Sequence, residues 1–269
     1  MTETKKLELA NTAAFILMIL LNGLANALPI NGFTTGELSD MYPNLFVPAG
    51  VTFSIWGLIY LLLAVFIITQ LLHFFETSGS NVNPEKYAAA DFVPRIGWYF
   101  VINGLANALW IVVWHYQLPV VALGVMLIIL WSLVRIYQNL GVGRREISPS
   151  VNWCAHIPFS VYLGWISVAT IANVTTVLVD FGYDGGAYPE IWAITMICVA
   201  GLLGLWFLIV KNDYAYAAVI VWATYGIWLK RTSVEPVFES VAYTAAGTAA
   251  LIVTAAVWWI ILQKKYRKV

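Results

Sequence analysis

Long hydrophobic segments with almost no charge alternate along this chain with short polar or turn-forming stretches. A helix must be about 20 residues long to cross a hydrocarbon layer of roughly 30 Å. Eight segments reach or approach that length, the seventh being short: 10–29, 50–73, 97–115, 119–139, 156–179, 190–210, 214–229 and 240–262. Continuous apolar runs differ from the alternating pattern of barrel strands. We therefore predict an all-α integral membrane protein, a bundle of about eight transmembrane helices.

Composition supports a multi-pass membrane protein whose main partner is the lipid bilayer. Of 269 residues, 61% are hydrophobic and only 10% are charged, and the mean hydropathy is +0.80. These values lie far from those of a soluble domain. The formal net charge is zero, so charge gives no indication of nucleic-acid binding.

Basic residues gather on one side of the predicted bundle. One side, made up of the termini, alternate loops and one helix end, contains Lys5, Lys6, Lys86, Arg95, Arg135, Arg144, Arg145, Lys211, Lys264, Lys265, Arg267 and Lys268. The other side has only Lys230 and Arg231, which lie near Glu235 and Glu239. Because cytoplasmic loops accumulate lysine and arginine, we expect both termini to be cytoplasmic.

One heptapeptide, NGLANAL, occurs twice, at residues 22–28 and 103–109. Two interpretations are open: an old duplication of a helical hairpin, or a packing surface of small residues that both helices need. The flanking sequences show no extended repeat, which favours packing. A secretory signal is the alternative for the first span, since Lys5 and Lys6 precede an apolar run ending at residues 25–27. The second copy of the heptapeptide disfavours that alternative.

Groups that commonly carry chemistry within membranes are missing from the predicted spans. No span has a central aspartate, glutamate or lysine, although proton and ion pathways usually need such groups. The three histidines show no metal-ligand spacing, and two distant cysteines predict neither a disulfide framework nor a metal site. We expect no catalytic residues of the hydrolytic type, no metal and no required cofactor.

Aromatic and amide side chains instead form three stripes at helical spacing, using the 100° advance per residue of an α-helix. The stripes are Phe53, Trp56 and Tyr60 in the second span, Asn103, Asn107, Trp110 and Trp114 in the third, and Tyr162, Trp165, Ala169 and Asn173 in the fifth. Three such faces can converge on one pocket.

Two structural explanations compete with a pocket. Tryptophan and tyrosine are enriched at membrane interfaces, which accounts for many of the thirteen tryptophans. It accounts poorly for Trp56 and Trp165, which lie several residues inside their spans, where an indole N–H needs a partner. Asn107 and Asn173 are equally well explained by hydrogen bonds between helices or by ligand contact.

At these stripes the chain resembles the tryptophan-rich sensory protein family (TspO), also called translocator proteins or peripheral benzodiazepine receptors. The resemblance covers about residues 10–180. Pro48, Gly50, Phe53, Trp56 and Tyr60 are similar to the start of the family's second helix, with Ala49 in place of a second proline. Asn107 with Trp110 is similar to its third helix. The series Tyr162, Trp165, Ala169 and Asn173 is similar to its fifth, with Val161 in place of a proline.

The resemblance implies a five-helix bundle over residues 1–180, with residues 181–269 as a three-helix extension. It also implies a pocket for porphyrin, haem, sterol-like lipids or similar hydrophobic small molecules. Trp56 and Trp165 would stack on the ligand, Tyr60 and Asn107 would be polar contacts, and Ala169 would leave room. Residues 33–49 would form a lid stiffened at Pro48. Family members usually form homodimers, and the extra helices leave that surface and the ligand entrance open. Porphyrin breakdown, associated with the family, would involve Trp56 and Trp165.

Three functions follow as hypotheses. The first is a membrane receptor or sensor of tetrapyrroles or related hydrophobic ligands, which also moves or scavenges them. The second is a small-molecule or lipid transporter, which broken helices or an inverted repeat would favour. The third is a structural partner in which the aromatic stripes serve helix packing alone.

Overall fold

A computed structural model describes residues 1–28, 30–76, 92–143, 148–183, 185–186 and 188–266, and the regular secondary structure of these residues is helical, with no strand. The helices are α1 (Glu3–Ala27), η1 (Ile30–Gly32), α2 (Thr35–Asp40), η2 (Gly50–Ser54), α3 (Ile55–Glu76), α5 (Phe92–Ile96), α6 (Tyr99–His115), α7 (Pro119–Leu140), α8 (Pro149–Val151), η4 (Asn152–His156), α9 (Ile157–Asp180), α10 (Pro189–Lys211), α11 (Tyr214–Ser233) and α12 (Glu239–Tyr266). The predicted all-α membrane bundle is confirmed.

Each of the eight predicted segments corresponds to one long helix, but the number of membrane crossings stays a prediction. Six helical stretches are both long and apolar enough to span a bilayer. They include α1, α7, α10 and α12, and two stretches in which α3 and α9 are extended by the short helices before them. Helix α6 is apolar but has only 17 residues. Helix α11 has 20 residues, and its last turn, residues 230–233, is entirely polar or charged.

Local sequence explains where several helices begin and end. Pro119, Pro149 and Pro189 each stand in the first turn of a helix, where the missing N–H costs nothing. Gly141 ends α7 in the left-handed conformation, with φ 68°, which glycine adopts without a steric penalty. Asp213 begins α11, and its carboxylate accepts a hydrogen bond from the Tyr216 N–H at 3.0 Å. These features separate spans that hydrophobicity alone would merge.

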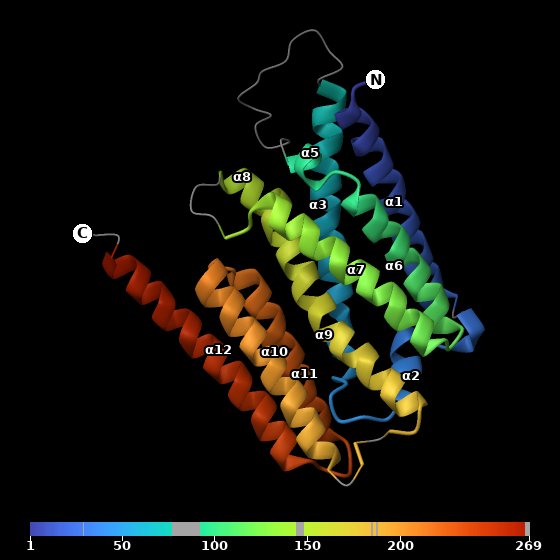
Figure 1. The fold of residues 1–269 in the computed structure, drawn as a ribbon, viewed down its shortest axis with the longest axis vertical. Helices are drawn as coiled ribbons and strands as arrows, with labels where there is room; N and C mark the ends of the chain where they lie inside the picture. The colour runs from blue at the N-terminus through green and yellow to red at the C-terminus, as the bar shows by residue number, and fades with distance from the viewer. Residues whose placement is uncertain (29, 77–91, 144–147, 184, 187, 267–269) are drawn as a thin grey trace.

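The long helices pack side by side in two connected groups (Figure 1). Helix α6 lies between α1 and α7, and α7 lies against α9. Helix α11 packs along α9 on one side and along α12 on the other, with α10 also against α12. Thus α10, α11 and α12 form a second group of helices that is joined to the first five mainly through the α9–α11 contact and also through contacts of α11 with η2 and of α10 with α9.

The helices that contain the two copies of NGLANAL, α1 and α6, run in the same direction side by side (Figure 1). A methyl group added at Gly104 of α6 would lie about 3.1 Å from Ala14 Cβ of α1. The Asn22 amide donates to the Asn107 amide oxygen at 2.8 Å. The Gly104 contact is what a packing surface of small residues provides, although Ala14 lies outside the first copy, whereas the Asn22–Asn107 hydrogen bond joins the two copies directly.

The start of α1 and the end of α12 both lie toward the same end of the bundle, the upper end of each helix in Figure 1. The described lysines and arginines of this end lie in α1, α5, α7, α10 and α12, while Lys230 and Arg231 lie at the opposite end of α11. The structure therefore separates the basic residues as the sequence pattern predicts. Lys86, Arg144, Arg145, Arg267 and Lys268 lie outside the described residues.

Candidate functional site

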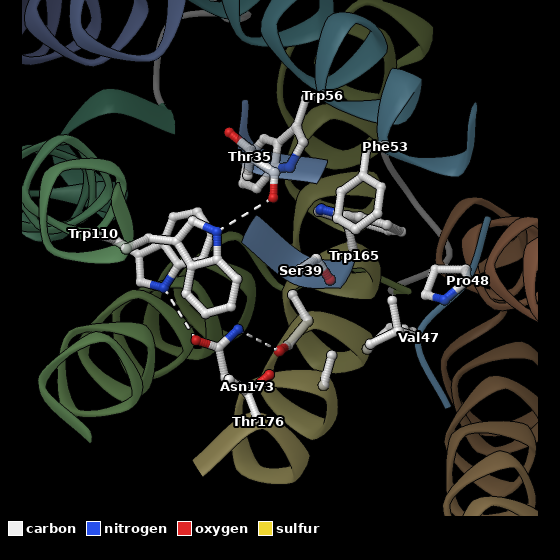
Figure 2. A pocket seen from close by; sticks show the side chains of 14 residues that line it. Thr35, Ser39, Val47, Pro48, Phe53, Trp56, Trp110, Trp165, Asn173 and Thr176 are labelled. Atoms are coloured by element: carbon white, nitrogen blue, oxygen red, sulfur yellow. Dashed lines mark hydrogen bonds between the residues drawn. The ribbon is translucent and has the colours of Figure 1, made fainter. Parts of the chain in front are cut away.

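Parts of all three aromatic stripes meet in a small cavity beneath the predicted lid (Figure 2). Helices η2 and α3 contribute Phe53 and Trp56, α6 contributes Trp110, and α9 contributes Trp165. The cavity has a volume of about 40 Å³, which is room for roughly three water molecules. The walls are aromatic and aliphatic, with a few hydroxyl and amide groups among them.

The aromatic rings around Trp56 and Trp165 pack mainly edge to face. The Trp56 and Trp165 ring centres are 6.4 Å apart at an interplanar angle of 84°, and Phe53 meets Trp165 at 5.8 Å and 85°. Trp56 stacks on Tyr60 at 5.6 Å. Edge-to-face and stacked pairs each add about 0.5–1.5 kcal/mol beyond area burial. The cluster is therefore a stiff wall for the cavity.

The indole N–H of Trp165 has no hydrogen-bond partner in the part of the chain that the structure describes. Trp165 is only 2% exposed, so water does not easily replace the missing acceptor. A buried donor without an acceptor costs about 1–3 kcal/mol. Trp165 thus presents an unused donor at the wall of the cavity.

Asn107 and Asn173 have different surroundings, although both lie on predicted stripes. Asn107 donates to the Tyr162 hydroxyl at 2.6 Å and accepts from Asn22 at 2.8 Å, and it does not line the cavity. Its contacts are those of an asparagine that joins helices. Asn173 lines the cavity, accepts from the Trp110 N–H at 3.2 Å and donates to the Ala169 carbonyl at 2.9 Å.

The predicted lid contains a short helix, α2, whose start is fixed by a capping box. The Thr34 hydroxyl accepts from the Glu37 N–H at 3.4 Å, while the Glu37 carboxylate accepts from the Thr34 N–H at 2.7 Å. A second hydrogen bond to that carboxylate, from the Thr34 hydroxyl, is 2.9 Å long. The backbone hydrogen bond first, and then the hydroxyl, lower the pKa of Glu37 below its ordinary value.

Helices α6 and α11 hold the lid over the cavity. The Trp114 N–H donates to the Thr35 carbonyl at 3.4 Å, which ties α2 to α6. On the other side, the Ala49 N–H donates to the Gly226 carbonyl at 3.0 Å, and the Trp222 N–H donates to the Thr52 carbonyl at 2.9 Å. The C-terminal helices thus reach the entrance region through α11.

Most, but not all, of the predicted site residues line the cavity. Those that do are Pro48, Phe53, Trp56, Trp110, Trp165, Ala169 and Asn173. In Figure 2, Val47 and Pro48 of the lid lie across the space from Trp110. The predicted residues that do not line it are Gly50, Tyr60, Asn107 and Tyr162.

Seven further lining residues were not named as ligand-binding residues: Thr35, Ser39, Val47, Trp114, Val168, Ala172 and Thr176. Trp114 belongs to the predicted α6 stripe, one turn beyond Trp110, and Thr35, Ser39 and Val47 lie within the predicted lid. Ala172 and Thr176 likewise extend the α9 stripe on the same face. Thr35 and Ser39 reach the site only because α2 folds over it, and no spacing rule relates them to α6 or α9.

The fold and the cavity together define a helical membrane protein with a cavity lined by aromatic side chains. Comparison with protein families matches residues 8–258 to the family described as TSPO-like protein. The chain belongs to this family. The match extends beyond the expected residues 10–180 and includes α10, α11 and most of α12. Comparisons with curated proteins and with solved structures found no match to the chain.

Proposed function

We propose that this protein is a membrane receptor for tetrapyrroles, such as porphyrin or haem, or for similarly flat hydrophobic ligands such as sterol-like lipids. The supporting observation is the cavity beneath the lid, which collects the aromatic residues of three helices around the unused Trp165 N–H. Indole faces favour flat apolar molecules, and one buried donor can fix the orientation of a ligand acceptor. Transport or scavenging of the same ligands is a natural extension of this role.

Binding requires the lid to move, because the volume of the cavity is small. Pockets for drug-sized ligands measure about 300–1,000 Å³, whereas this cavity has about 40 Å³. The lid contacts that must break include the Thr35–Trp114 hydrogen bond, the Asp40–Lys230 ion pair, and the hydrogen bonds of Ala49 and Thr52 with α11. We therefore propose that α2 and the return segment before η2 swing away together when ligand enters.

The test is a titration of purified protein with protoporphyrin, followed by the absorbance of the porphyrin. The double variant Trp56→Phe, Trp165→Phe should bind about tenfold more weakly, which corresponds to about 1.4 kcal/mol. Trp258→Phe is the matched control, since Trp258 of α12 is 62% exposed and is not among the residues that line the cavity. Equal affinity in the wild type and the double variant would exclude the cavity as the porphyrin site.

A transporter is the alternative function, and the described helices favour it less. Alternating-access carriers commonly have helices that break near the middle of the membrane. Here the irregular segments η2 and η4 adjoin the first residues of α3 and α9, and α9 then continues for 24 residues. Porphyrin flux into protein-containing liposomes, compared with empty vesicles, distinguishes the two functions. Gradient-driven flux would require a carrier, and saturable binding without flux would support a receptor.

A further inference from the structure

A second, larger cavity lies beside the lid at the end of the bundle away from the termini. Its volume is about 570 Å³, which is within the range of small-molecule sites. The lid, the end of α9, the start of α10 and the segment after α11 enclose it, so it lies between the first five helices and the last three. We call it the vestibule. Ser39 and Val47 line both the vestibule and the aromatic cavity.

The vestibule contains the two basic residues that break the charge pattern of the chain. Its charged described lining residues are Asp40, Lys230 and Arg231, a balance of two positive groups against one negative group. The Lys230 ammonium forms an ion pair with the Asp40 carboxylate at 2.6 Å. Asp40 is paired with Lys230, so Arg231 forms no ion pair of its own with the described lining residues.

Arg231 is buried without full hydrogen bonding. The residue is 8% exposed, and its Nε has no hydrogen-bond partner in the described part of the chain. The Trp192 indole N–H, at another wall of the vestibule, also lacks a described partner. A buried guanidinium is costly unless an anion accompanies it. Two donors without described partners beside one cavity, one of them on a guanidinium, fit an anionic, hydrogen-bond-accepting ligand.

The rest of the vestibule is suited to a hydrocarbon body. Leu45 and Val47 from the lid segment, Leu178 from α9 and Phe238 before α12 are among its lining residues. Burial of hydrocarbon on such walls contributes about 25 cal/mol per Å². A ligand with one acidic end and an apolar remainder would use both parts of the lining.

We infer that the vestibule is a binding site for apolar molecules that carry a carboxylate, with Arg231 as the principal anchor of the acid group. A guanidinium binds a carboxylate through two parallel N–H···O bonds, and this geometry is specific as well as strong. Lys230 is the secondary anchor, because its ammonium group already forms an ion pair with Asp40. This site is independent of the aromatic cavity and does not rest on the function proposed for that cavity.

The test uses the fluorescent fatty acid cis-parinaric acid and its neutral methyl ester, with the full-length protein in phosphatidylcholine nanodiscs. The acid should bind more tightly than the ester to the wild type. Arg231→Gln should weaken binding of the acid about tenfold while leaving the ester unchanged, as expected for loss of a charged hydrogen bond. Unchanged ester binding also shows that the variant is folded. Arg135→Gln, at the opposite end of the bundle, is the matched control and should bind like the wild type.

Asp40→Asn provides a second test, and a merely structural role for Arg231 would not produce its expected result. Removing the Asp40 charge frees Lys230, so the acid should bind severalfold more tightly than to the wild type. Equal binding of acid and ester, or unchanged acid binding in both Arg231→Gln and Asp40→Asn, would overturn the inference.

Two further experiments distinguish which anion occupies the vestibule and which of the two cavities binds the acid. If nanodiscs with phosphatidylglycerol abolish acid binding, a lipid phosphate occupies the vestibule and the carboxylate assignment fails. The Trp56→Phe, Trp165→Phe variant should retain acid binding, which separates failure of the vestibule from failure of the aromatic cavity. Loss of acid binding in that variant would place the acid in the aromatic cavity and contradict the inference.

Discussion

At the scale of single residues, two tryptophans of one cavity differ in whether their indole N–H is used. Trp110 donates to Asn173, whereas Trp165 has no described acceptor. Both are almost fully buried, at 6% and 2% exposure, so truncation to phenylalanine removes similar packing. We expect Trp110→Phe to lower the free energy of unfolding by about 1–3 kcal/mol more than Trp165→Phe, because it leaves the Asn173 oxygen unpaired. Unfolding in mixed micelles measures the difference, and equal losses would contradict it.

Helical spacing in the sequence predicts the walls of this cavity but not its hydrogen bonds. Spacing alone placed Trp56, Trp110 and Trp165 on faces that meet, because helical geometry fixes which residues share a face. It did not distinguish Asn107 from Asn173, since both have the same side chain on similar stripes. Which one joins helices depends on Asn22, which lies 85 residues from Asn107 in the chain. Partners at such separations follow from tertiary packing, which no local pattern encodes.

At the scale of elements, the capping box makes the stability of helix α2 depend on pH. The pKa of Glu37 is lower in the folded lid than in an unfolded one. Its stabilising contribution is therefore complete above the ordinary pKa of a glutamate and is lost as the pH falls through the folded value. We expect the lid helix to become more mobile under acidic conditions, and Glu37→Gln to remove that dependence.

A nitroxide attached at Gly36→Cys, with Cys154 and Cys198 replaced by serine, measures the effect. Gly36 is suitable because an added Cβ would meet no atom within 4 Å. The spectrum of the label should broaden as the pH rises through the acidic range in the Glu37 protein and stay constant in the glutamine variant. A pH response of the same size in both proteins would rule out the capping box as its cause.

Gly226 of α11 permits the contact between the C-terminal helices and the start of α3. A methyl group at this position would overlap the Thr52 hydroxyl of η2, so Gly226→Ala must push η2 and α11 apart. We expect a loss of about 1–3 kcal/mol in unfolding free energy, together with weaker porphyrin binding, because Phe53 belongs to the displaced segment. Gly247→Ala is the matched control, since nothing lies within 4 Å of its added Cβ. It should be neutral or stabilise the protein by about 0.5–1 kcal/mol. Equal effects of the two changes would show that the η2–α11 contact is unimportant.

The long helices followed from the sequence, whereas the short elements between them did not. Hydrophobic runs predicted all eight long helices, because an apolar run in lipid has few alternatives to a helix. The lid was expected as a loop of residues 33–49, yet it contains α2. The Thr34 and Glu37 pair has the spacing of a capping box, so this helix start had a local signal. The position of α2 over the cavity depends on Trp114 and α11, and no local signal specifies it.

At the scale of the whole molecule, the fold places both termini and most described basic residues at one end. The sequence predicts that this end is cytoplasmic, since lysine and arginine favour that side. Three single cysteines in a Cys154→Ser, Cys198→Ser background test the prediction: Glu3→Cys, Lys265→Cys and Val234→Cys. All three positions are exposed at helix ends or in a connection. A membrane-impermeant maleimide added to intact cells should label only Val234→Cys, and all three should react after the membrane is permeabilised. The start of α1 and the end of α12 lie at the same end of the bundle. Labelling of only one of Glu3→Cys and Lys265→Cys would therefore contradict this arrangement of the two helices. Labelling of both, with Val234→Cys protected, would instead reverse the orientation and place the vestibule on the cytoplasmic side.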